Sequence, residues 1–482
     1  MKRYAPLALV VLTMACVAKT PEQQFQDDLA AALGGRERVL AVRTLVLEGE
    51  GRQFNLGQDM RPGAADQTFT VSGWKRQIDL TQPRFRNELT RTPNFAYFQG
   101  QAPQRQVQGL DGGIGYNVSP TGTATRIATP AAGDRRADRY HHPLVIASAA
   151  LAPNASISNL RTHGSERLAD VLTGDGIPLV LAVDGNHRPA RVESRSYHIN
   201  LGDVILSTHF ADYQQRDGVP VPTRLTTKVD DFTTGEYRIA TTTINGTVDE
   251  LAAPPAAAAA AIPEPAPPNV AAEPIAPGVW LLGGQTHHSA LIELSKELLL
   301  VDAPQSEART LAVMAKAREL QPAKPLTKVI TTHHHFDHTA GIRAAIAEGL
   351  TIVTHSGNRA FFEEMAKRPH TIQADALAKN PKPVRVETVD DELVMKDPTR
   401  TVSVYHVAGN PHSDTMLMVH LPAERVIVEV DAFTPGSQVN PYAANLLENI
   451  RRRKLNVDRI VPLHGAIAPM AELMKVGEKQ TN

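Results

Sequence analysis

One histidine-rich segment limits the folds open to this chain more than any other part of it. The segment reads Thr332-His333-His334-His335-Phe336-Asp337-His338. It follows an apolar run at residues 328–332 and precedes residues 342–347, where Ile342, Ala345 and Ile346 share one helical face. Side chains at the end of a strand meet at a rigid sheet edge, and the spacing His-x-His-x-Asp-His can aim two ligand sets at neighbouring positions. The segment therefore predicts a strand, a turn and a helix that hold two metal ions.

Three further potential ligands follow this segment, each directly after an apolar strand-like run: His412, Asp431 and His464. A chance run of histidines is the alternative interpretation of the segment, and these three residues weaken it. Cys16 is the only cysteine and lies in an apolar N-terminal stretch. A metal site in the folded part of the chain must therefore use histidine and carboxylate ligands.

These residues resemble the signature of the metallo-β-lactamase superfamily from about residue 279 to the C-terminus. The resemblance implies an α/β fold, a four-layer αββα sandwich with two mixed sheets between outer helices and the metals at one edge. It implies the following roles: His333, His335 and His412 bind the first metal, Asp337, His338 and His464 bind the second, Asp431 bridges both, Asp302 supports the ligands through hydrogen bonds, and His334 points away.

Two features of the sequence indicate which branch of the family this chain resembles. The position of Asp431 before Ala432 and Phe433 is similar to that of the aspartate in the glyoxalase II and lactonase branches. His412 and His464 are only 52 positions apart, which leaves no room for the large inserted domain of the nuclease branches. We therefore expect a lactonase-, esterase- or thioesterase-like hydrolase.

The chemistry of the ligands favours two Zn²⁺ ions as cofactors. Imidazole and carboxylate suit zinc, and a metal pair lowers the pKa of a bridging water and polarises a substrate oxygen. We expect the metal-bridging hydroxide to attack an ester, lactone, thioester or amide carbonyl of a small-molecule substrate. The leaving group would take a proton from Asp337, the candidate catalytic residue, or from water. His287, His288 and His355 are candidates for contact with the substrate, and ordinary loop histidines are the alternative.

Two other functions fit the same residues. Some relatives hold one iron with two histidines and one aspartate and perform oxygen chemistry on a sulfur substrate, so an iron-dependent sulfur dioxygenase-like enzyme is one alternative. The other is a protein whose N-terminal domain binds an envelope lipid or polymer while its metal domain is not catalytic. The presence of all seven ligands argues against the second alternative. Residues 358–380 form either a lid or a helical pair that completes the core.

The N-terminus has the layout of a signal peptide over residues 1–18. Lys2 and Arg3 precede an apolar stretch at residues 5–17, which is shorter than the roughly 18 residues of a membrane-spanning helix. Cys16 resembles the lipid-modified cysteine of bacterial lipoproteins, and ordinary cleavage near Ala15 or Ala18 is the alternative. The prediction is an exported protein of the periplasm or cell envelope, with a lipidated Cys16 as a potential membrane anchor.

An Ala/Pro-rich segment divides the chain. Of the 27 residues at 251–277, twenty are alanine or proline, which predicts a semi-rigid linker or a short helical turn. It separates an N-terminal domain at residues 20–250 from the metal domain at residues 278–482, where strands and helices alternate. The strands predicted there are at residues 279–282, 290–294, 297–301, 328–332, 350–354, 384–388, 401–406, 415–420, 425–430 and 459–462, and the helices at 306–320, 342–347 and 446–454.

The pattern of the N-terminal domain is mainly β, typical of an antiparallel sheet or half-barrel with a few helices. Strands are predicted at residues 43–54, 67–80, 178–183, 191–210 and 236–245, and a helix at residues 143–151. The dipeptides Asp184-Gly185, Asp217-Gly218 and Asn245-Gly246 favour hairpin turns. The outline resembles half-barrel envelope proteins that carry lipids, which makes an envelope component a candidate partner. The chain has fifty basic and fifty-one acidic residues, so it has no net positive charge that would attract nucleic acid, and no nucleic-acid partner is expected.

Overall fold

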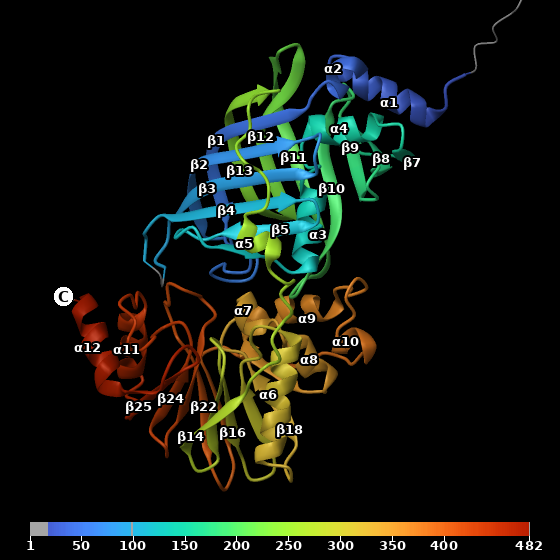
Figure 1. Cartoon of the computed structure of the whole chain (residues 1–482). Coiled ribbons are helices and arrows are strands. Elements are labelled where there is room, and N and C mark those ends of the chain that lie inside the picture. The colour runs from blue at the N-terminus through green and yellow to red at the C-terminus, as the bar shows by residue number, and fades with distance from the viewer. Residues whose placement is uncertain (1–17, 98–99, 482) are drawn as a thin grey trace, which may run out of the picture.

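The computed structural model describes residues 18–97 and 100–481 (Figure 1). The predicted signal peptide, apart from Ala18, and Cys16 lie outside the described residues. Among the helices of the described part, none is long and apolar enough to cross a membrane.

The N-terminal domain is built on one antiparallel sheet of 13 strands, as the β-rich pattern predicts. The strands are β1 (Thr44–Phe54), β2 (Thr68–Asp79), β3 (Arg84–Pro93), β4 (Gln104–Asp111), β5 (Ile114–Val118), β6 (Ala124–Arg126), β7 (Ser156–His163), β8 (Glu166–Leu172), β9 (Pro178–Val183), β10 (Pro189–His198), β11 (Gly202–Arg216), β12 (Val219–Val229) and β13 (Phe232–Ile244). Their order is β6-β5-β4-β3-β2-β1-β13-β12-β11-β10-β9-β8-β7. Strands that follow one another in sequence are neighbours in the sheet, except β6 and β7, which lie at its two ends, and the first and last strands, β1 and β13, pair at its centre.

Helices cover one face of this sheet. They are α1 (Pro21–Ala32), α2 (Arg36–Leu40), α3 (Thr129–Asp138) and α4 (Pro143–Leu151). Leu29 of α1 and Leu144 and Ile146 of α4 are fully buried against sheet residues that include Ile78 and Leu181. Pro at the first position of α4 and the capping bond from Leu144 N–H to His142 Nδ1 start this helix at the predicted residue. Figure 1 shows the strands of β1 to β4 in front of β11 and β12, with α3 and α4 beside them.

Two of the predicted β features are wrong. Residues 191–210 are not one strand but parts of β10 and β11, because the chain turns at residues 199–201 and Gly202 takes a positive φ of 71°. Asn245-Gly246 does not form a hairpin: Asn245 has a φ of 56°, and the chain leaves the sheet there. The other two dipeptides do connect neighbouring strands, β9 to β10 and β11 to β12.

The predicted linker is not a free spacer along its whole length. Residues Pro255–Ala259 form the short helix α5, whose Ala257 is buried against Tyr116 of the N-terminal sheet. Residues Ala271–Ala276 form strand β14, which pairs with β15 (Val279–Gly283) at the edge of a sheet. An edge strand tolerates Pro274, because one side of its backbone needs no ladder partner. The linker prediction is therefore too long at its C-terminal end.

The C-terminal domain contains two mixed sheets. The first has the order β14-β15-β16-β17-β18-β19-β20 and is parallel from β17 to β20; the second has the order β21-β22-β23-β24-β25-β26 and is parallel only between β24 and β25. The strands after β15 are β16 (Ser289–Glu293), β17 (Leu298–Val301), β18 (Leu326–Ile330), β19 (Thr351–His355), β20 (Val386–Val389), β21 (Glu392–Lys396), β22 (Thr401–His406), β23 (Leu417–Leu421), β24 (Val426–Glu429), β25 (Arg459–Pro462) and β26 (Ala468–Pro469).

Three apolar clusters hold these elements together. One contains residues of both sheets, such as Val301 and Val419, and lies between them. Another joins the first sheet to α6 and α8, and a third joins the second sheet to α11 and α12. The helices are α6 (Glu307–Leu320), α7 (Phe336–Thr339), α8 (Ile342–Ala347), η1 (Ser356–Asn358), α9 (Arg359–Lys367), α10 (Ala376–Lys379), α11 (Ala443–Arg452) and α12 (Met470–Thr481).

The stretch at residues 358–380 packs apolar side chains into the core. Phe362 and Met365 of α9 and Leu377 of α10 are buried in the same cluster as Ile342 and Ile346 of α8. Of the two interpretations of this stretch, the helical pair that completes the core is the one observed, since its apolar side chains already have packing partners.

Candidate metal centre

The histidine-rich segment runs from the end of β18 into α7, and Asp302 fixes its start. Asp302 follows β17 with a φ of 60° and is fully buried. Its Oδ1 accepts from Thr332 N–H at 2.7 Å and its Oδ2 accepts from the Thr332 hydroxyl at 2.8 Å. These two bonds tie the ends of neighbouring parallel strands together, which holds the turn at the sheet edge.

A first group of potential ligands consists of His333, His335, His412 and Asp431. One ligand atom from each residue lies within 4.8 Å of all the others. His412 Nε2 lies 3.1 Å and His333 Nε2 lies 3.4 Å from Asp431 Oδ2. All four side chains are buried, so a cation held by them would be largely shielded from water.

A second group consists of His287, Asp337, His338 and His464, again with ligand atoms within 4.8 Å of one another. Asp337 Oδ2 lies 3.2 Å from His287 Nε2 and 3.6 Å from His338 Nε2. The Asp337 side chain is 41% exposed, so this group faces the outside more than the first does.

Asp431 lies between the two groups. Its Oδ2 is 3.1 Å from His338 Nε2 as well as 3.1 Å from His412 Nε2, and its Oδ1 is 3.0 Å from His464 Nε2. One carboxylate therefore touches histidines of both groups, which is the arrangement that a bridging ligand requires.

The donor atoms fit a metal. Within the described part of the chain, His333 Nε2 and His335 Nδ1 are buried and have no hydrogen-bond partner. Burial lowers the pKa of both imidazoles well below the ordinary value, and neighbouring histidines lower it further, so both rings are neutral with a lone pair available. Buried polar atoms without partners are rare, and a coordinated cation would satisfy them.

The remaining charges of the site compensate one another. Burial alone would lower the pKa of His338, but Asp431 and Asp337 raise it well above the ordinary value. Burial would raise the pKa of Asp431, whereas His338 and His412 hold it well below the ordinary value. The carboxylate of Asp431 is thus ionised, as a metal ligand must be.

The structure places the other predicted residues as follows. Asp302 Oδ2 accepts from His338 Nδ1 at 3.2 Å, the supporting contact expected of it. His334 faces away from both groups and bonds through Nε2 to Asp59 Oδ1 at 2.9 Å. His288 and His355 are in neither group: His288 N–H bonds to Leu463 O, and His355 Nδ1 accepts from Gly357 N–H.

Sequence reasoning missed the part that His287 plays. The sequence makes this residue a candidate for substrate contact, and the structure brings it into the second ligand group, with its Nε2 3.2 Å from Asp337 Oδ2. Thr286 fixes this region, because its Oγ1 lies 3.0 Å from His287 Nδ1 and its carbonyl 3.0 Å from His464 Nδ1. The available signal is the pair His287-His288 directly before β16, because the neighbouring strand β17 is followed directly by Asp302.

Residues of the N-terminal domain also reach the site, and nothing in their spacing predicted it. Gln58 Nε2 donates to Asp337 Oδ1 at 2.8 Å, and His335 Nε2 donates to Asp59 O at 2.9 Å. Asn200 Nδ2 donates to Phe336 O at 3.1 Å. These residues lie in loops more than 130 positions away from their partners.

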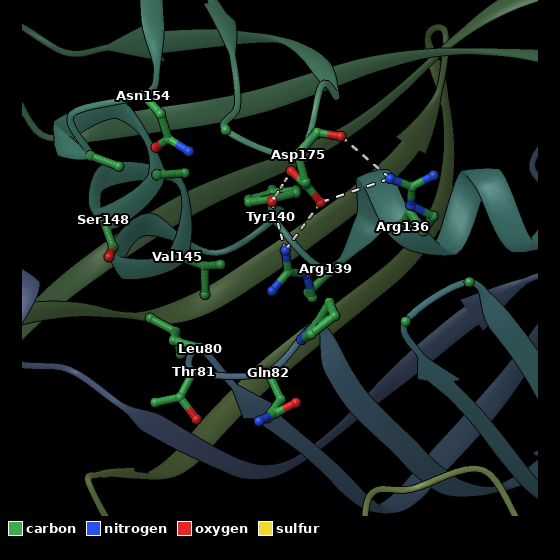
Figure 2. A pocket seen from close by; sticks show the side chains of 16 residues that line it. Leu80, Thr81, Gln82, Arg136, Arg139, Tyr140, Val145, Ser148, Asn154 and Asp175 are labelled. Carbon is green, nitrogen blue, oxygen red and sulfur yellow. Dashed lines mark hydrogen bonds and ion pairs between the residues drawn. The ribbon is translucent and has the colours of Figure 1, made fainter.

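A separate cavity of about 640 Å³ lies in the N-terminal domain (Figure 2). Its wall combines apolar side chains, such as Leu80 and Val145, with a charged cluster. In that cluster, Asp175 Oδ2 lies 3.6 Å from Arg139 and 3.9 Å from Arg136. Two guanidinium groups facing one carboxylate leave one net positive charge beside an apolar wall.

Comparison with known proteins finds similarity for the C-terminal part of the chain. Residues 282–464 match the family model described as the metallo-beta-lactamase superfamily, and the N-terminal domain lies outside the match. This segment contains all eight residues of the two ligand groups. Similar solved structures include the DIM-1 metallo-beta-lactamase (17% identity, 45% of this chain, 99% of that chain, TM-score 0.36), TMB-1 (20%, 45%, 100%, 0.34) and a metallo-beta-lactamase from Pontibacter korlensis (16%, 44%, 100%, 0.35).

Proposed function

We propose that this chain, in which residues 282–464 form a metallo-β-lactamase superfamily domain, is a dinuclear zinc hydrolase. The observation that carries the proposal is the contact of Asp431 with both ligand groups. His333, His335 and His412 would hold one Zn²⁺, and His287, Asp337, His338 and His464 would offer ligands to the other. The domain would be the four-layer αββα sandwich that the sequence predicts.

The bound cations would supply an activated water and polarise the oxygen of a substrate carbonyl. The protein's own contribution is positional. Asp431 holds the two ligand groups together, and Asp302 orients His338 from behind. Asp337 is the catalytic residue in this proposal, because its partly exposed carboxylate is placed to carry a proton to the leaving group.

We propose an ester, lactone, thioester or amide of a small molecule as the substrate. The ligand set of histidine and aspartate lacks a thiolate, which agrees with the predicted lactonase-like branch. Specificity in such enzymes depends on loops around the site, so the substrate class is to be decided by assay.

The test is metal analysis of the full chain together with a hydrolase panel of esters, lactones, thioesters, amides, β-lactams and phosphodiesters. We expect two zinc ions per chain and hydrolysis of a carbonyl substrate. His335→Ala should lose zinc and activity, whereas His163→Ala, an exposed histidine of the N-terminal sheet, should lose neither. One iron per chain with oxygen uptake on a sulfur substrate would overturn the proposal in favour of the dioxygenase-like alternative.

The cavity in Figure 2 supports a second, binding function for the N-terminal domain. An apolar wall with one net positive charge fits an anionic amphiphile, such as a lipid of the cell envelope. A fluorescent fatty acid should bind the full chain, and Ser148→Asp, at a half-buried position of the cavity wall, should abolish this binding without loss of zinc. Equal binding by the variant would exclude the cavity as the site.

Export to the cell envelope is also part of the proposal. It is supported by the layout of Lys2, Arg3 and the apolar residues that follow them. Cell fractionation should find the protein outside the cytoplasm, and a Cys16→Ser variant that stays membrane-associated would argue against lipidation of Cys16.

A further inference from the structure

The loop between β1 and β2, at residues 55–67, leaves the N-terminal sheet and packs on the histidine-rich turn of the other domain. Phe336 N–H donates to Gly57 O at 3.2 Å, and Asp414 N–H donates to Met60 O at 2.7 Å. The loop is therefore held at two points, one within the metal-binding turn and one two residues after His412. Its two central residues, Gln58 and Asp59, lie between these points.

Gln58 controls the orientation of one ligand. Its Nε2 donates to Asp337 Oδ1 at 2.8 Å. The other oxygen of the same carboxylate, Oδ2, lies 3.2 Å from His287 Nε2 and 3.6 Å from His338 Nε2, within the second ligand group. Because one oxygen is fixed by the amide, the carboxylate cannot turn away, and the free oxygen faces the place where a cation would lie.

Asp59 acts on the first ligand group. His335 Nε2 donates to the carbonyl oxygen of Asp59 at 2.9 Å. This bond requires the proton on Nε2, which leaves the lone pair on Nδ1, the buried atom without a partner in the described structure. The Asp59 carboxylate meanwhile bonds His334 Nε2 at 2.9 Å, so the residue is anchored to the turn by side chain and backbone together.

We propose that the β1–β2 loop is a working part of the metal centre, with Gln58 and Asp59 as positioning residues for Asp337 and His335. This inference rests on the proposed metal site. It assigns the N-terminal domain a role in metal binding, although the proposed ligands all lie in the C-terminal domain. Partners that orient metal ligands typically change metal affinity by about 10–100-fold when they are removed.

The experiment measures zinc affinity of the full chain by competition with a chromophoric chelator, and the visible spectrum of the Co²⁺-loaded protein. Gln58→Met keeps the shape of the side chain and removes its donor. We expect about tenfold weaker binding of one of the two zinc ions and a changed Co²⁺ spectrum. Asp59→Ala removes the bond to His334 and loosens the loop, so we expect it to weaken the binding of the other zinc ion.

Gln67→Met is the matched control, because it makes the same change at the end of the same loop, where the described structure shows no side-chain bond to the turn. Gln58→Asn, with a shorter amide, serves if Gln58→Met does not fold, and thermal unfolding of every variant separates loss of metal from loss of fold. A parent that binds two zinc ions, with all variants binding equally well, overturns this inference and leaves the proposed function intact. A parent that binds no zinc overturns the proposed function itself.

Discussion

His338 Nδ1 donates to Asp302 Oδ2 across 3.2 Å, and both side chains are fully buried. The bond places the proton of His338 on Nδ1 and turns Nε2 toward Asp431 and His464. Because Asp302 also accepts from Thr332 beside His333, replacement of the acceptor should disturb the second metal position more than the first.

Asp302→Asn is expected to weaken binding of the second zinc ion by about 10–100-fold, since an amide cannot accept from both Thr332 and His338 as the carboxylate does. Zinc titration against a chelator measures the effect. Asp231→Asn, at an exposed turn between β12 and β13, is the control and should leave both affinities unchanged. An unaltered second site in Asp302→Asn would refute the supporting role of this residue.

Asp431→Asn should reduce the zinc content of the chain from two ions to one or none. The physical reason is that the Asp431 carboxylate contacts His338, His412 and His464 and supplies the negative charge between the two groups. Metal analysis after dialysis reads the stoichiometry directly. Asp458→Asn, an exposed aspartate of the same domain, should keep both ions, and full zinc content in Asp431→Asn would rule out bridging.

The metal-binding turn was readable from the sequence because its ligands follow apolar strands in a short, dense pattern. Strands such as β17 and helices such as α6 were likewise predicted within a few residues, since hydrophobic periodicity decides them. Strand β14 was missed because alanine and proline carry no strand signal, and pairing with β15 outweighs their low propensity.

The contribution of the N-terminal domain was not predictable in the same way. Gln58 and Asp59 lie in a loop whose composition is that of an ordinary surface loop, and their partners are more than 270 positions away. Hydrogen bonds of this kind depend on how two domains dock, which no local pattern encodes. His287 was partly predictable. The sequence shows that it precedes a strand, but it does not show that its side chain points into the second ligand group.

The stability of the N-terminal domain should fall in mild acid. Burial, together with the nearby Arg76, lowers the pKa of His141 to about 4 and that of His142 to about 3, although Asp138 and Glu193 oppose the shift of His141. Below pH 6.5 the two histidines bind protons in the unfolded chain, whereas in the folded chain they stay neutral until the pH approaches 4 and 3. The stabilisation is therefore complete above pH 6.5 and is lost as the pH falls toward 4 and 3, by about 2 kcal/mol per histidine at pH 5.

His142→Asn tests this dependence, because asparagine can still cap α4 at Leu144 N–H while it cannot titrate. Urea denaturation at pH 7.5 and pH 5 should show about 2 kcal/mol less acid destabilisation in the variant than in the parent. The same pH dependence in both proteins would mean that His142 is already protonated when folded or that other groups dominate.

Phe362→Ala distinguishes a core role of α9 from a lid. Phe362 is fully buried in the cluster that joins α8, α9 and the first sheet, so its truncation should lower the free energy of unfolding by about 3–5 kcal/mol. Leu311→Ala on α6, a side chain that is 37% exposed, should change it by no more than about 0.5 kcal/mol. If α9 were instead a mobile lid, Phe362→Ala would leave chemical denaturation unchanged and alter the KM of the hydrolysis, because the side chain would then meet the substrate and not the core.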